Sequence, residues 1–135
     1  MGFSHGASAW EEVRSRDDAV SADPRGVATL RMDGLLERLV KARAHLLRGE
    51  VAAKGQAISR CVEIIGGLRD SLDPKIGPAM LGRLDSLCDY ASRRLLQANL
   101  HDDATIIDEV SKLMQQMRES WVQIAPPPVS HVVGG

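Results

Sequence analysis

Apolar residues recur through the central part of the chain at alternating intervals of three and four, the spacing that places side chains on one face of an α-helix. The first such segment follows Asp23-Pro24, where Asp caps free N–H groups and Pro suits the first helical position. It stops near Gly49. Its inward stripe consists of Met32, Leu35, Leu39, Ala42 and Leu46, with Leu36, Val40 and Leu47 widening the face.

A second helix is predicted from about Glu50 to Leu72, with the same 3, 4, 3, 4 spacing. Its stripe consists of Ile58, Cys61, Ile65, Leu68 and Leu72. Inside it lies Gly66-Gly67, and each interior glycine costs a helix about 1 kcal/mol relative to Ala. The pair therefore predicts either a kink or the close approach of another backbone.

Two further helices follow the turn signals Asp73-Pro74 and Gly77-Pro78. The third is predicted to end around Asn99 and to bury Leu81, Leu84, Cys88, Ala91, Leu95 and Ala98. Asp102 is the predicted cap of the fourth, which ends at the prolines of 126–128. The fourth stripe is Ile106, Val110, Leu113, Met117 and Ile124, with Ile107, Met114 and Trp121 beside it.

Four amphipathic helices joined by short turns bury their stripes together as an antiparallel bundle, since each turn reverses the chain. We therefore predict an all-α, antiparallel four-helix bundle over residues 23–125. Residues 1–22 are polar and irregular apart from Trp10 and Val13, and are predicted to form a flexible N-terminal arm. Residues 126–135 are predicted to be a short disordered tail.

Composition agrees with one small helical domain. The chain has 135 residues, of which 44% are hydrophobic but only 3% are aromatic, which favours interlocking aliphatic helices over a sheet. Seventeen Lys and Arg against eighteen Asp and Glu leave a net charge of −1, so no single-sign field indicates nucleic acid binding.

No apolar run approaches the roughly 20 residues that span a bilayer, so no membrane insertion is expected. The first twenty residues are charged where a secretory signal would be apolar, which favours a cytoplasmic location.

The sequence offers little chemistry for catalysis. His5, His45, His101 and His131 are scattered and form no Glu-x-x-His set, so neither a metal nor another cofactor is expected. Cys61 and Cys88 fall at apolar positions of helical stripes, as buried thiols do. No Ser or Cys has an evident base near it in the sequence, and we expect no enzyme activity.

A surplus of apolar residues is more informative. Ala57 and Ile64 lie beside the second stripe, and Leu87 and Tyr90 lie beside the third. They either broaden the core face or line a groove that holds a helix of another protein. Trp10 is likewise either incidental or a side chain that packs on an apolar surface.

The third and fourth helices carry a closer resemblance. The run from Leu84 to Leu100 resembles the signature of the FliS family of flagellin-export chaperones, and the similarity continues at Asp103, Ile107, Glu109, Val110, Leu113 and Trp121. It extends back through Leu72-Asp73, Ile64-Ile65, residues 49–55, Asp33-Gly34 and residues 21–24. Trp10 and Val13 also fall in register, so the match covers roughly residues 10 to 124.

This resemblance implies a cytosolic chaperone that holds the disordered C-terminal segment of flagellin, prevents premature polymerisation and delivers flagellin to the flagellar type III secretion apparatus. It implies no enzyme activity and no cofactor, and it allows contacts with the export gate or regulatory proteins. It also gives the N-terminal arm the role of a removable lid on the client surface. A structural or regulatory bundle that acts through self-association is the alternative.

We therefore predict a partner-binding surface without catalytic or metal-binding residues. Arg93 and Arg94 are either solvated or paired with Asp89 or an acidic client group. The predicted partner-binding residues are Trp10, Val13, Ala57, Ile64, Leu87, Tyr90 and Arg94.

Overall fold

The computed structural model describes residues 24–124, with side chains from Gly26 onward. Four α-helices and one short 3₁₀-helix account for nearly all of this range, and no strand occurs within it. The predicted all-α fold is therefore confirmed. The elements are α2 (Pro24–Leu47), α3 (Val51–Asp70), η1 (Pro74–Ile76), α4 (Pro78–His101) and α5 (Ala104–Ile124).

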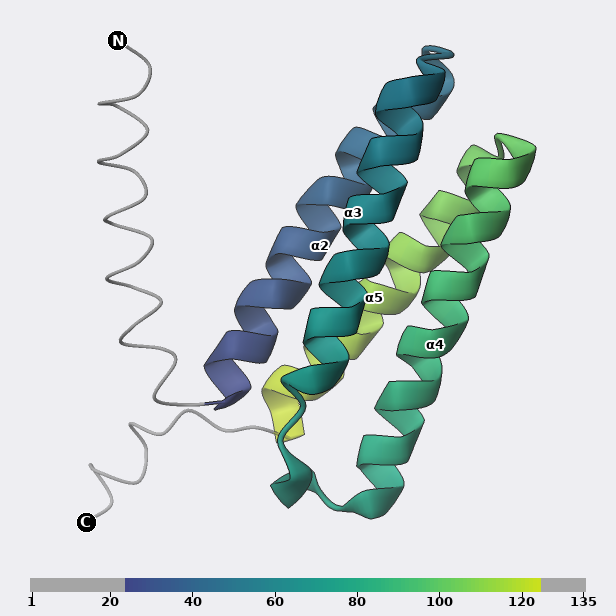
Figure 1. Ribbon diagram of the computed structural model, residues 1–135. Helices are drawn as coiled ribbons and strands as arrows, with labels where there is room; N and C mark the ends of the chain where they lie inside the picture. The colour runs from purple at the N-terminus through teal and green to yellow at the C-terminus, as the bar shows by residue number, and fades with distance from the viewer. Residues whose placement is uncertain (1–23, 125–135) are drawn as a thin grey trace, which may run out of the picture.

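The helices form a bundle in which each has two neighbours (Figure 1). Helix α2 packs on α3 and α5, and α4 packs on the same two helices. Consecutive helices run in opposite directions, so the start of α2 and the end of α5 lie at the same end of the bundle. No helix within 24–124 combines the length and the apolar character needed to cross a bilayer. The predicted arm (1–22) and tail (126–135) lie outside the described residues.

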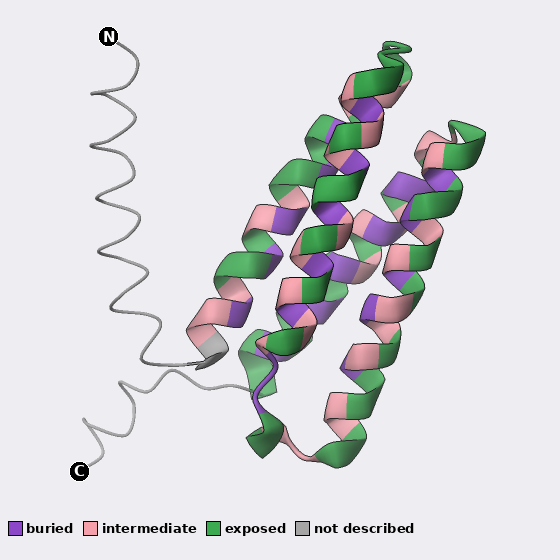
Figure 2. Ribbon diagram, in the orientation of Figure 1, coloured by how far each residue is buried: buried purple, intermediate pink, exposed green. Residues whose placement is uncertain are grey.

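The core lies along the bundle axis, where the buried stripes of the four helices face one another (Figure 2). The predicted stripes of α2, α3 and α4 are confirmed at most positions, although Leu46 and Leu81 are only half-buried. Interlocking aliphatic side chains supply most of the stabilisation, at about 25 cal/mol per Å² of apolar surface removed from water. Both cysteines are buried in this core with free thiols.

The predicted stripe of α5 is wrong in part. The buried series is Ile107, Val110, Met114, Met117 and Trp121, again at intervals of 3, 4, 3 and 4, together with Ile106. Leu113 is half-buried and Ile124 is exposed. The sequence carries two overlapping apolar stripes on this helix, and the one with the larger side chains faces the core because it removes more apolar surface from water.

The outer edge of the α2 stripe also differs from its prediction. Val40 is 68% exposed and Leu47 is 60% exposed, so neither widens the core face as expected. Leu36, beside them, is half-buried against the core. These side chains leave an apolar strip open to water.

The turn between α2 and α3 forms a Schellman motif. Gly49 adopts φ +71°, which glycine reaches without steric cost, and its N–H donates to the Leu46 carbonyl. The N–H of Glu50 donates to the carbonyl of His45 at 3.0 Å. This turn satisfies carbonyls at the end of α2, in agreement with the predicted stop near Gly49.

The turn between α4 and α5 corrects the predicted cap. Asp103, not Asp102, caps α5, because its carboxylate accepts from the Thr105 N–H at 3.0 Å. Asp102 adopts a left-handed conformation and its carboxylate accepts instead from the ammonium of Lys54. The same ammonium donates to the Asn99 carbonyl at 3.0 Å. Lys54 thereby joins α3 to the end of α4, and it is buried despite its charge.

The structure explains one of the two adjacent glycines. A Cβ at Gly67 would collide with the guanidinium of Arg31 on α2, whereas a Cβ at Gly66 would meet nothing within 4 Å. The close neighbour of Gly67 is therefore a side chain, where the sequence predicted either a kink or another backbone. Helix α3 continues through both glycines to Asp70.

Candidate partner-binding surface

The predicted binding residues of α3 lie on its flank toward α2. Arg69 marks the opposite flank, since its guanidinium reaches Asp85 on α4. Ile64 lies five residues earlier, which is about 140° around the helix axis. Ala57 is seven residues before Ile64 and shares its flank. Both side chains are half-buried and pack on the core, so they line the α2/α3 seam.

The predicted binding residues of α4 lie on its flank toward α5. Glu109 on α5 accepts from the Tyr90 hydroxyl at 2.6 Å and from the Arg94 guanidinium at 2.9 Å. Leu87, one turn before Tyr90, lies on the same flank and is half-buried. Leu87, Tyr90 and Arg94 therefore lie along the α4/α5 seam.

Glu109 links two of the predicted residues although the prediction did not include it. The hydrogen bonds from Tyr90 and Arg94 stabilise its carboxylate and lower the pKa of Glu109. The hydrogen bond to Glu109 in turn raises the pKa of Tyr90. Glu109 is among the positions that resemble the FliS family, but no periodic pattern connects it to Tyr90, which lies on another helix.

The structure thus separates the predicted residues into two groups. Ala57 and Ile64 lie at the α2/α3 seam, and Leu87, Tyr90 and Arg94 lie at the α4/α5 seam. These seams are on opposite sides of the bundle, so the five residues do not line one groove. Trp10 and Val13 lie outside the described residues.

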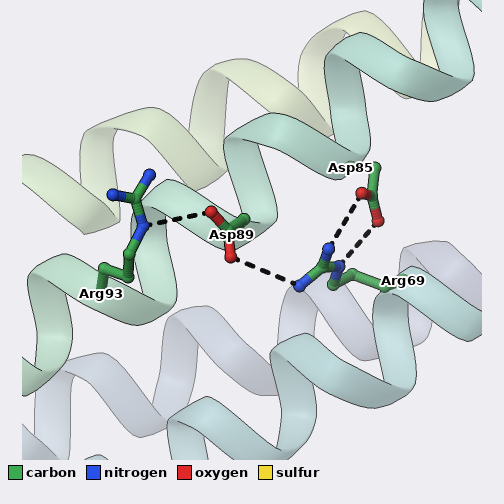
Figure 3. A network of polar contacts seen from close by, with 4 residues as sticks. All are labelled: Arg69, Asp85, Asp89 and Arg93. Carbon is green, nitrogen blue, oxygen red and sulfur yellow. Dashed lines mark hydrogen bonds and ion pairs between the residues drawn. The ribbon is translucent and has the colours of Figure 1, made fainter.

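The α3/α4 seam between these groups carries a network of charges (Figure 3). Arg69 donates to both carboxylate oxygens of Asp85, at 2.7 and 2.9 Å, and lies 3.8 Å from Asp89. Asp89 also accepts from Arg93 at 3.1 Å, one turn further along α4. Of the alternatives for Arg93, pairing with Asp89 is the one observed. The bidentate bond to Arg69 lowers the pKa of Asp85.

The α2/α5 seam on the opposite side contains an open groove with a volume of about 570 Å³. Two Arg–Asp pairs bridge this seam, Arg43 to Asp108 at 2.7 Å and Arg118 to Asp33 at 2.5 Å. The α5 side is polar. The α2 side is a ridge of apolar residues formed by Leu36, Val40, Ala44 and Leu47.

The sequence prediction missed this groove because it assigned the same apolar residues to the core face. Periodicity places Leu36, Val40 and Leu47 on one edge of the α2 stripe, which is correct. It does not reveal whether a neighbouring helix covers that edge. The side chains of α5 that face it are short or polar, Ser111 and Gln115 among them, and they leave it open.

These surfaces lack the groups that chemistry would need. Burial raises the pKa of Cys61 and of Cys88 to about 11, so both are neutral thiols near pH 7 and poor nucleophiles. Within the described part of the chain, no three His, Cys, Asp or Glu side chains cluster as metal ligands. Apolar strips beside charged side chains are suited to binding another polypeptide.

Comparison with known proteins adds a family. The sequence model of the family described as flagellar protein FliS matches residues 7–128. The flagellar secretion chaperone FliS of Salmonella typhimurium is 41% identical over 122 residues, which cover 90% of either chain. The flagellar secretion chaperone FliSB of Pseudomonas aeruginosa is 37% identical, over 83% of this chain and 89% of its own. The flagellar secretion chaperone FliS of Escherichia coli is 33% identical over 86% of either chain.

Proposed function

Since the chain belongs to the FliS family of flagellar proteins, we propose that it binds the disordered C-terminal segment of flagellin and delivers flagellin to the type III secretion apparatus. Its relatives are named flagellar secretion chaperones, and an export chaperone role follows from them. FliS is a family of chaperones and not of enzymes, so the protein works by binding. We place this function in the cytoplasm, where export clients are made.

The observation that carries the proposal is apolar surface left over after the core is complete. Every helix supplies a buried stripe, yet Val40 and Leu47 on α2 and Leu96 on α4 remain more than half exposed. Contiguous exposed apolar surface marks a site of interaction with another protein. A disordered segment that folds onto it buries about 1,000–3,000 Å², offset by an ordering cost of about 2–5 kcal/mol, which permits specific but reversible binding.

The separation of the predicted residues bears on how flagellin is held. A client that contacts both Ile64 at the α2/α3 seam and Tyr90 at the α4/α5 seam has to pass over at least two helices. An extended segment can do this, whereas a compact domain would cover one side of the bundle. The two groups therefore favour a disordered client that wraps around the chaperone.

The remaining parts of the proposal rest on the family resemblance. The N-terminal arm, through Trp10 and Val13, covers part of the client surface in the empty chaperone and leaves it when flagellin binds. Holding the C-terminal segment prevents premature polymerisation. The loaded chaperone then contacts the export gate, and regulatory proteins share its surface.

The direct test is calorimetry of the purified protein with a peptide of the flagellin C-terminal segment from the same bacterium, together with circular dichroism. We expect saturable binding with a negative heat-capacity change and a gain of helicity beyond the sum of the parts. A control peptide of the same composition in scrambled order should not bind. Absence of binding at roughly tens of micromolar peptide, where a useful chaperone complex would form, contradicts the proposal.

The same exposed apolar residues favour one other function, a structural or regulatory bundle that acts through self-association. Sedimentation velocity over a range of concentrations separates the two. A monomer at all concentrations that still binds the peptide supports the chaperone. A stable dimer that does not bind the peptide supports the alternative.

A further inference from the structure

The apolar ridge of α2 has the form of half a helix–helix interface. Leu36, Val40 and Leu47 follow one another at intervals of four and seven, so they form a line about 16 Å long on one flank of the helix. A neighbouring helix recognises such a line through its own side chains at i, i+4 and i+7. Among the described residues no fifth helix occupies this position, and Val40 stays 68% exposed.

Ion pairs frame this ridge without covering it. Asp33–Arg118 lies below Leu36, and Arg43–Asp108 lies between Val40 and Leu47 on the side toward α5. Both pairs hold α5 against α2 and leave the apolar side chains between and beyond them in contact with water. The groove is therefore a fixed feature of the folded bundle that needs no opening motion.

A cation stands at the upper end of the groove. Arg48 lines it beside Leu47, and in the part of the chain that the structure describes no carboxylate lies within ion-pair distance of its guanidinium. The other groove arginine, Arg43, is already held by Asp108. An occupant with a carboxylate near the end of its helix would satisfy Arg48 and gain a charge-assisted hydrogen bond.

The position of the groove relative to the two predicted client groups indicates the occupant. A segment that contacts Ile64 and Tyr90 crosses either α2 and α5 or α3 and α4. The second route passes over the network of Arg69, Asp85 and Asp89, and burying these ion pairs beneath an apolar helix would cost more than it returns. The first route passes over Val40 and Leu47.

We propose that the α2/α5 groove binds one amphipathic helical segment of the export client, about three turns long, with apolar residues spaced to meet Leu36, Val40 and Leu47 and an acidic residue that pairs with Arg48. This inference rests on the proposed function and adds to it the side of the bundle that the client crosses. The surface is separate from both groups of residues predicted from the sequence.

Val40→Glu tests the groove, with Leu100→Glu as its matched control. Both side chains are largely exposed, at 68% and 73%, and Leu100 lies at the far end of α4, outside the groove. Neither change should affect folding, which circular dichroism and thermal unfolding verify. In calorimetry with the flagellin C-terminal peptide, we expect Val40→Glu to weaken binding roughly tenfold or more and Leu100→Glu to leave it unchanged.

A second measurement does not depend on lost affinity. A thiol introduced by Val40→Cys can be labelled selectively with an environment-sensitive dye, because Cys61 and Cys88 are fully buried and their pKa is raised to about 11. The dye emission should shift to the blue when the peptide covers it, and a dye placed through Leu100→Cys should not respond.

The outcomes separate the two levels of the argument. Tight peptide binding by the wild type, with no dye response at position 40 and full affinity in Val40→Glu, overturns the groove and leaves the proposed function standing. Loss of affinity in Val40→Glu without a dye response also overturns the groove, since the substitution then acts at a distance. No peptide binding by the wild type overturns the proposed function and this inference with it.

Discussion

At the scale of single residues, Gly66 and Gly67 should respond differently to the same substitution. Gly66→Ala meets open space and should raise the free energy of unfolding by about 1 kcal/mol, the difference in helix propensity. Gly67→Ala forces the guanidinium of Arg31 to move and should gain clearly less. Urea unfolding monitored by circular dichroism measures both values.

Arg31→Ala provides the control for this explanation. With the Arg31 side chain removed, Gly67→Ala should gain about as much as Gly66→Ala does, so a double-mutant cycle should show coupling between positions 31 and 67. If Gly67→Ala is equally favourable with and without Arg31, the contact does not explain the glycine.

At the scale of elements, Lys54 is expected to stabilise the end of α4 and the turn into α5. Lys54→Met removes the donor to the Asn99 carbonyl and to Asp102, and should lower the free energy of unfolding by about 1–3 kcal/mol. Hydrogen exchange of the Asp103 amide, which donates to the Ala98 carbonyl in this turn, should become faster.

Asp102→Gly is the matched change on the other side of that contact. Glycine keeps the left-handed conformation seen at Asp102, and the Asp102 carboxylate is 65% exposed, so the loss should be smaller than for Lys54→Met. Equal losses in the two variants would mean that the ion pair matters more than the bond to Asn99.

The same turn illustrates how far sequence reasoning reaches. Periodicity and turn residues predicted the four helices and most of their buried stripes, since burial repeats with the helical period and Gly49 and Pro74 mark interruptions. They placed the cap of α5 one residue too early, because either of two adjacent aspartates can cap a helix. The contact that engages Asp102 comes from Lys54, 48 residues away, and no local rule contains it.

The candidate surface was predicted less well for a related reason. Helical spacing places Ile64 and Tyr90 beside their core stripes, but the flank toward which each points depends on which helices are neighbours. Only the packed bundle shows that one faces α2 and the other α5. Val40 and Leu47 were assigned to the core since their exposure depends on the short polar side chains of α5 opposite them.

At the scale of the whole molecule, removal of residues 1–16 should tighten flagellin binding. An arm that covers the client surface reduces the fraction of chaperone ready to bind, and the apparent dissociation constant rises by that factor. If Trp10 and Val13 keep the surface covered nine-tenths of the time, deletion should tighten binding about tenfold. Calorimetry with the same flagellin peptide measures the change.

Two variants of the full-length chain separate a lid from a general effect of shortening. Trp10→Ala with Val13→Ala removes the apolar side chains but keeps the length and charge of the arm, and should reproduce most of the gain. Glu11→Gln with Glu12→Gln changes neighbouring residues of the same arm and serves as the control, since the lid contact is attributed to apolar packing. Because the ordered bundle of residues 24–124 has its own core, its thermal stability should stay the same in every variant. Unchanged or weaker binding after deletion would mean that the arm is not a lid, and weaker binding in particular would make the arm part of the client site.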